Sequence, residues 1–263
     1  MIDIRTGDAP LIVSIPHAGV EIPAGVTGLV SPELARHDAD LYVDRLYAFA
    51  AELDATIVRT PVSRTVIDVN RDPAGQTLYP GQFTTGLCPV ETFDSIPLYL
   101  PGGEPDAAEI ARRRTAWFDP YHAALTGEIA RLRARHAAIV LYDAHSIRSV
   151  APRLFDGVLP AFNIGTNDGA SCAPALAAAI GQVCDDSGRT RVTNGRFKGG
   201  WITRHYGAPM RGVHAIQMEL AMRAYLIETP EDWPPPWHPA TARDCQRTLR
   251  RILTAAIDFA RHQ

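Results

Sequence analysis

The sequence lacks an excess of charge of either sign. Its 263 residues include 26 lysines and arginines against 29 aspartates and glutamates, which leaves a formal net charge of −3. Such a chain has no basic field to attract nucleic acid or an anionic membrane surface. It also lacks any apolar run near the roughly 20 residues that a membrane-spanning helix needs. We therefore expect neither a nucleic-acid partner nor a membrane partner.

Cysteine is scarce, and no two cysteines form a C-x-x-C pair. Cys88, Cys172, Cys184 and Cys245 are scattered along the chain. This distribution is typical of small buried side chains in a reducing compartment. The opening stretch MIDIRTGDAP has neither the charged start nor the apolar core of a signal peptide. Both features predict a cytoplasmic protein.

The composition is that of a globular domain, with 46% hydrophobic and 21% charged residues. We expect one domain over residues 1–263 with a full core. Apolar runs predict strands at 11–15, 55–60, 65–70, 137–145, 161–166, 190–194 and 214–220. Helical periodicity predicts helices at 32–53, 106–136, 173–184 and after residue 240. Because several strands are continuous apolar runs, both faces of the sheet should be covered. The fold class is therefore α/β, a three-layer α/β/α domain around a mostly parallel mixed sheet.

Three segments do not follow this alternation. Residues 72–105 are rich in Gly, Pro and Thr, and a connection of this length usually covers a site. Residues 195–212, GRFKGGWITRHYGAPMRG, are basic and punctuated by glycine. We expect both segments to be loop excursions that contact a substrate. Residues 229–239, TPEDWPPPWHP, should form a stiff connector to the last helix.

Polar residues at strand ends are the candidate functional groups, because ligands of such sheets bind outside the carboxyl ends of the strands. His17 follows LIVSIP, His145 closes AAIVLYDAH, and Glu219 lies near the end of HAIQMEL. Zinc in a hydrolytic site usually takes three protein ligands and leaves one position for water. The ion lowers the pKa of that water and polarises a carbonyl oxygen. The pattern therefore predicts a metal centre with His17 and His145 as ligands.

The third ligand has three candidates. Asp44 in DADLYVDRLY is favoured, Glu21 follows His17 by four residues, and Asp143 lies two residues before His145. Asp143 could instead orient an imidazole from behind. The expected cofactor is a divalent metal ion, with Zn²⁺ favoured and Co²⁺, Mn²⁺ or Fe²⁺ compatible with the same donors.

The stretch VSRTVIDVNR, residues 62–71, has an arginine near each end. A guanidinium at such a position can hold a carboxylate through two parallel hydrogen bonds. The alternative is a structural ion pair between Asp68 and one of the arginines. Glu219 lies in a predicted buried strand, where an unpaired carboxylate is costly. It is therefore expected to be functional, with a structural salt bridge as its alternative.

Taken in order, the motifs IPHAG, DADLYVDRLY, SRTVIDVNR, LYDAHS, FKGGWITRHYG and IQMEL resemble those of the N-formylglutamate deformylase family, also called N-formylglutamate amidohydrolases. The resemblance covers nearly the whole chain. It implies a phosphorylase/hydrolase-like fold related to zinc carboxypeptidases and to the aspartoacylase and succinylglutamate desuccinylase group. It also implies metal-dependent hydrolysis of N-formyl-L-glutamate, a small dicarboxylate, to formate and L-glutamate, as the last step of a histidine-degradation pathway.

The resemblance implies roles for individual residues. Glu219 would be the general base, and Arg64 would polarise the acyl oxygen. Asn70 and Arg71, in the DVNR stretch, would hold one substrate carboxylate. Lys198, Arg204 and Arg211 in the basic loop could hold the other carboxylate. One departure concerns the metal: the relatives have a carboxylate three residues after the first histidine, where this chain has Val20, with Glu21 one residue late.

Two other functions remain open from the sequence. One is a related metal-dependent deacylase that acts on another N-acyl amino acid or on a small peptide. The other is a non-catalytic binding protein on the same fold. The sequence gives no prediction of the oligomeric state.

Overall fold

The computed structural model describes residues 2–77, 81, 83–229 and 233–263. Within them, seven strands form one sheet in the order β1-β3-β2-β4-β7-β5-β6. The strands are β1 (Asp3–Arg5), β2 (Leu11–Ile15), β3 (Thr56–Arg59), β4 (Ile139–Ile147), β5 (Phe162–Gly165), β6 (Arg191–Thr193) and β7 (Val213–Ala221). The four central strands β3, β2, β4 and β7 are parallel. At one edge β1 pairs antiparallel with β3, and at the other β5 pairs antiparallel with β7. The last strand, β6, is parallel to β5. The predicted mostly parallel mixed sheet is confirmed.

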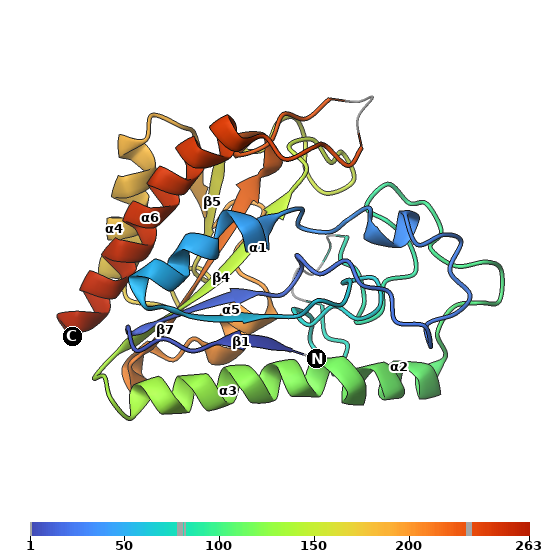
Figure 1. Cartoon of the computed structure of the whole chain (residues 1–263), viewed down its shortest axis with the longest axis horizontal. Coiled ribbons are helices and arrows are strands. Elements are labelled where there is room, and N and C mark those ends of the chain that lie inside the picture. Colours follow the sequence, from blue (N-terminus) through green and yellow to red (C-terminus); the bar gives the residue numbers. More distant parts are fainter. Residues whose placement is uncertain (1, 78–80, 82, 230–232) are drawn as a thin grey trace.

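Helices cover both faces of this sheet. They are α1 (Val43–Leu46), α2 (Ala107–Arg113), α3 (Asp119–Arg133), α4 (Pro174–Asp186), α5 (Trp201–Tyr206) and α6 (Pro239–Arg261). Shorter turns of helix are η1 (Leu34–Arg36), η2 (Ala48–Leu53), η3 (Arg114–Phe118), η4 (Pro209–Arg211) and η5 (Met222–Ala224). Figure 1 shows α4 and α6 together on one side of the sheet and α3 on the other. The three predicted layers are therefore present.

The central strand β4 shows how the two faces are divided. Tyr142 and Ala144 belong to the apolar cluster under α4 and α6, while Ile139 and Leu141 belong to the cluster under α3 and α5. Because side chains alternate along a strand, the next odd-numbered positions of β4 also face α3 and α5. Every residue of β4 and β7 is buried, as the continuous apolar runs predicted.

Two predicted elements take a different form. Residues 65–70 are not a strand: the Val66 amide bonds to the Ser63 carbonyl, and the Asp68 amide bonds to the Leu87 carbonyl, so the chain has left the sheet after β3. The helix predicted over 32–53 is divided into η1, α1 and η2. The left-handed backbone conformation of Tyr42, with φ 58°, causes the break just before α1. Strand β1 and helix α5 were not predicted as separate elements.

Parts of two predicted segments lie outside the described residues. They are residues 78–80 and 82 of the excursion at 72–105, and residues 230–232 of the connector at 229–239. In the part of the chain that the structure describes, no helix combines the length and the apolar character needed to cross a membrane.

Candidate active site

The parallel strands β2, β4 and β7 end at the same edge of the sheet, and their polar residues meet there. Ser14 is paired with Asp143, Asp143 with Gln217, and His145 with Glu219. All five residues lie on the sheet face that α3 and α5 cover, because their positions alternate with those facing α6. His17 follows β2 at this edge. The structure thus brings together the strand-end groups singled out in the sequence.

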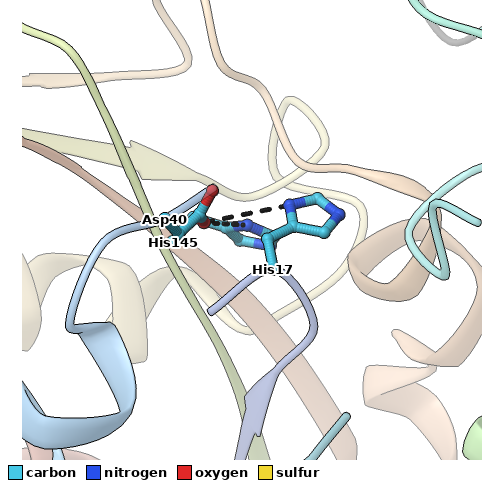
Figure 2. Close-up of side chains that lie close together, drawn as sticks. All are labelled: His17, Asp40 and His145. Carbon is cyan, nitrogen blue, oxygen red and sulfur yellow. Dashed lines mark hydrogen bonds and ion pairs between the residues drawn. The ribbon is translucent and has the colours of Figure 1, made fainter. Parts of the chain in front are cut away.

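Two histidines and one aspartate form the centre of the site. His17, Asp40 and His145 are buried, and one candidate ligand atom from each lies within 4.8 Å of the other two. Asp40 Oδ2 is 3.1 Å from His145 Nδ1 and 3.8 Å from His17 Nδ1. Figure 2 shows dashed lines from the Asp40 carboxylate to both imidazole rings. Among the described residues, His17 Nδ1 has no hydrogen-bond partner although it is buried.

Each imidazole is held on its far side by a second carboxylate. His17 donates from Nε2 to Asp68 Oδ1 at 2.7 Å, and His145 Nε2 is 3.1 Å from Asp143 Oδ2. Both Nδ1 atoms therefore face Asp40. Metal-binding histidines usually show this pattern, in which one ring nitrogen faces the ion and the other is fixed by a carboxylate.

Asp44, which the sequence favoured as the third ligand, is not in this cluster. Its Oδ2 accepts a 2.6 Å bond from Arg59, and its side chain is 36% exposed. The left-handed turn at Tyr42 separates Asp44 from Asp40. The Asp40 amide donates to the His17 carbonyl at 3.0 Å, which holds Asp40 beside the histidine. Asp40 therefore replaces Asp44 in this arrangement.

The other two candidates for the third ligand are not members of the His–Asp–His cluster either. Glu21 is exposed, and its backbone pairs with Val62 outside the named strands. Asp143 is buried beside His145, where it accepts a 2.9 Å bond from the Ser14 hydroxyl. Its place behind the ring matches the alternative in which Asp143 orients an imidazole.

The buried carboxylates control the charge on the two histidines. Burial, together with the nearby Arg64 guanidinium, lowers the pKa of His17 to about 4, so this ring is neutral. Burial also opposes the charged form of His145, but the carboxylates of Asp143 and Asp40 outweigh it and hold the pKa of His145 well above its usual value. Without a metal ion, the site therefore draws a proton onto His145.

Glu219 is the fourth polar group of this edge. Its side chain is buried, and its Oε2 accepts a 3.1 Å bond from the Gln217 amide. Burial raises the pKa of Glu219 to about 8, although the nearby His145 opposes this shift. A carboxyl group with such a pKa can take up and return a proton near neutral pH.

His17, His145 and Glu219 line one cavity. It is lined by His17, Arg64, Asn70, Arg71, Phe83, Thr84, Thr85, Phe93, His145, Ser146, Ile147, Leu154, Arg196, Phe197, Gly200, Gln217 and Glu219. Arg64 donates to Asp68 at 2.7 Å and lies 3.6 Å from Asp40. The structural ion pair considered for Asp68 is thus present, and the same arginine also faces the cavity.

Asn70 and Arg71 line the cavity next to the histidines. The Asn70 side-chain amide donates to Asp143 Oδ2 at 3.2 Å, and its oxygen accepts from the Ile202 amide at 2.8 Å. Asn70 therefore joins β4 to the start of α5. Arg71 donates to the carbonyl and the hydroxyl of Thr85, each at 3.0 Å. These bonds hold the guanidinium at the cavity wall.

The basic loop contributes a different cation from those predicted. Lys198 is 41% exposed and lies 3.1 Å from Asp168, and Arg204 donates to the Gly199 carbonyl at 2.9 Å. Neither is among the described residues that line the cavity. Arg211 is exposed in η4, before the start of β7, and thus at the opposite end of this strand from Glu219. Its prediction as a substrate-binding residue is corrected for this reason. Among the described residues of this loop, the cation that lines the cavity is Arg196.

A buried His–Asp–His cluster beside a carboxyl group is the type of site found in metal-dependent hydrolases. Comparison with known proteins narrows this class. The family model for N-formylglutamate amidohydrolase matches residues 9–226. The N-formylglutamate deformylase of Pseudomonas aeruginosa is 43% identical over 265 residues, which cover 100% of this chain and 98% of that protein. The deformylase of Pseudomonas putida is 42% identical, with 98% of this chain and 96% of that protein covered.

A solved structure agrees with these matches. The crystal structure of N-formylglutamate amidohydrolase from Ralstonia eutropha JMP134 has a TM-score of 0.83 and 25% identity, with 99% of this chain and 98% of that chain covered. The chain belongs to the N-formylglutamate amidohydrolase family. The family and the amidohydrolase class predicted from the motifs are therefore confirmed.

The contact between Gly200 and Asn70 gives a stability prediction. A Cβ atom at Gly200 would lie 2.4 Å from the Asn70 side-chain nitrogen, which buried hydrogen bonds hold in place. We expect Gly200→Ala to lower the free energy of unfolding by about 1–3 kcal/mol, the usual cost of overpacking. Urea unfolding measures this change.

Gly127→Ala is the matched control. A Cβ at this position in α3 meets nothing within 4 Å. Because alanine favours a helix over glycine, the control should gain about 0.5–1 kcal/mol. Equal effects of the two substitutions would contradict the close contact at Gly200.

Proposed function

We propose that this chain hydrolyses N-formyl-L-glutamate to formate and L-glutamate, and that it uses a divalent metal ion held by His17, Asp40 and His145. The observation that carries the proposal is the buried His–Asp–His cluster, whose two histidines line one cavity with Glu219 and with arginines. Membership of the N-formylglutamate amidohydrolase family supports the substrate. The same membership supports a cytoplasmic role as the last step of histidine degradation.

The donor set fits a metal ion. The unpartnered Nδ1 of His17 and the Asp40 carboxylate face a common centre, and Asp68 and Asp143 hold the rings from behind. The buried carboxylates favour a cation at this place, as the raised pKa of His145 indicates. Zn²⁺ suits these donors best, and Co²⁺, Mn²⁺ or Fe²⁺ can also use them. When bound, the ion supplies a Lewis acid that activates water and polarises the formyl oxygen.

The side chains perform the proton transfers. Glu219 accepts a proton from the attacking water and then gives it to the leaving nitrogen as the C–N bond breaks. Arg64 stabilises the negative charge that develops on the formyl oxygen, and its bond to Asp68 keeps it in position. Asn70 bonds to Asp143, which lies behind His145, and to the start of α5, and so fixes their relative positions. Arg71 binds the α-carboxylate next to the reacting amide.

The test is formate release from N-formyl-L-glutamate by protein purified without chelator, combined with elemental analysis of bound metal. We expect formate release that a chelator abolishes and Zn²⁺ restores. N-acetyl and N-succinyl amino acids separate the proposal from another deacylase, which would prefer one of them. A non-catalytic binding protein would release no formate from any of these substrates.

Substitution of Asp40 tests the third ligand. We expect Asp40→Asn to lose bound metal and formate release, because the carboxylate donor is removed while the size of the side chain is kept. Elemental analysis of the purified variant measures the loss, and circular dichroism checks the fold.

Asp44→Asn is the matched control. It removes the partner of Arg59 at a partly exposed position, where an ion pair is worth about 0–1 kcal/mol. This variant should keep its metal and its activity. Metal loss in Asp44→Asn with full metal content in Asp40→Asn would return the assignment to Asp44.

Substitution of Glu219 tests the general base. We expect Glu219→Gln to keep the metal and to lower kcat by at least ~100-fold, the usual contribution of a positioned base. Steady-state formate release at neutral pH measures the effect. A kcat near that of the unsubstituted enzyme would remove Glu219 from the proton transfer.

A further inference from the structure

Arg196 is a cation of the cavity that the proposed chemistry has not used. It lies in the basic loop after β6 and is half-buried. Its Nε donates to the Leu154 carbonyl at 2.6 Å, and one of its terminal nitrogens donates to the Phe83 carbonyl at 3.1 Å. Its guanidinium carbon is 5.4 Å from the centre of the Phe197 ring. Two backbone carbonyls from separate segments therefore fix this guanidinium at the wall of the cavity.

The surroundings of Arg196 differ from those of the other two arginines. Phe83, Leu154 and Phe197 pack against an apolar cluster that contains Phe93 and Ile147, and all five residues line the cavity. Arg64 and Arg71, by contrast, lie 2.7 Å and 3.6 Å from Asp68, which holds His17. The cavity thus has two arginines beside Asp68, which holds His17, and a third, Arg196, that is bound to the backbone of segments whose apolar side chains also line the cavity.

An N-formyl acidic amino acid has two carboxylates that could use these two kinds of arginine. Its α-carboxylate is one carbon from the reacting nitrogen, so its partner must lie close to the catalytic groups, as Arg71 does. The side-chain carboxylate of glutamate is separated from that nitrogen by three carbons, two of them methylenes. Its partner must therefore lie farther away, beyond an apolar surface that contacts the methylenes.

We propose that Arg196 binds the side-chain carboxylate of the substrate and thereby selects acidic N-formyl amino acids. This assignment rests on the proposed function and adds a specificity-determining residue to it. A site built to pair a charged group of the substrate rejects analogues that lack the charge, because the protein group then loses its partner in a desolvated cavity. Arg196 should therefore discriminate between a carboxylate and an amide at the same position.

The experiment compares N-formyl-L-glutamate with N-formyl-L-glutamine, which has nearly the same shape and no side-chain charge. For Arg196→Met, kcat/KM on N-formylglutamate should fall by about 10- to 100-fold, in line with loss of a charge-assisted hydrogen bond, and mainly through KM. On N-formylglutamine it should change by less than about 3-fold. Arg196→Lys, which keeps the charge but not the planar fork, should recover part of the preference for glutamate.

Arg191→Met is the matched control for the loss of a cation. Arg191 lies in β6 and pairs with Asp185 at 2.7 Å on the surface. This variant should keep the preference of the unsubstituted enzyme. Thermal unfolding checks that all three variants are folded. The ratio of kcat/KM on N-formylglutamate to kcat/KM on N-formylglutamine is then compared among the folded variants.

The possible results distinguish a failure of the proposed function from a failure of the Arg196 assignment. An unsubstituted enzyme that releases formate from neither substrate contradicts the proposed function and the assignment of Arg196 with it. An active enzyme whose glutamate-to-glutamine ratio is unchanged in Arg196→Met and Arg196→Lys overturns the assignment alone. An equal loss on both substrates also overturns it, because this result is expected of an arginine that only supports the cavity wall.

Discussion

The buried negative charge at the edge of the sheet is the constraint on which the rest of the site depends. Asp40, Asp68 and Asp143 are at most 2% exposed. Arg64 is a buried guanidinium that contacts two of these carboxylates. Buried carboxylates are costly unless they are paired or coordinate a metal. A cation held by the imidazoles and Asp40 would compensate the charge that Arg64 and Arg71 leave uncompensated.

This electrostatic requirement also joins segments that are far apart in the sequence. Asp68 accepts bonds from His17 and Arg64 and from the Asn70 amide, so residues 64–71 are held against the end of β2. Asp40 is tied to the same histidine through its backbone, and its Oδ2 also accepts a bond from the Ser146 amide at the end of β4. Loss of one carboxylate would therefore disturb the position of several loops as well as the charge of the site.

The sequence predicted those parts of the protein in which the local pattern of apolar and polar residues matches their burial in the fold. The apolar runs of β2, β4 and β7 are buried on both faces, and their polar ends meet at one edge because parallel strands end together. Glu219 could be singled out because an unpaired carboxylate within such a buried run is costly. Gln217 lies on the same face two residues earlier and carried the same signal.

The third member of the His–Asp–His cluster was not predictable in this way. A continuous helix over 32–53 would place Asp40 and Asp44 on one face, since residues four apart are neighbours on a helix. The left-handed conformation of Tyr42 breaks this relation, and only the contact with the His17 backbone selects Asp40. The strand predicted at 65–70 was also wrong, because contacts that the local pattern does not show determine the path of its backbone. Its backbone amides bond to the Ser63 and Leu87 carbonyls, and the Asp68 carboxylate accepts from the Asn70 amide within the segment.

The path of the basic loop explains why charge alone did not identify the cation that lines the cavity. A Cβ at Gly165 in β5 would lie 2.5 Å from the Gly199 amide nitrogen, so the loop packs directly on the backbone of this strand. The Gly200 amide then donates to the Gln217 side chain at 2.6 Å. Because the loop is fixed at these two places, Arg196 and Phe197 line the cavity, while the Lys198 side chain lies beside Asp168. The glycines of this segment therefore act through close packing as well as through turns, and a count of its positive charges could not show which one lines the cavity.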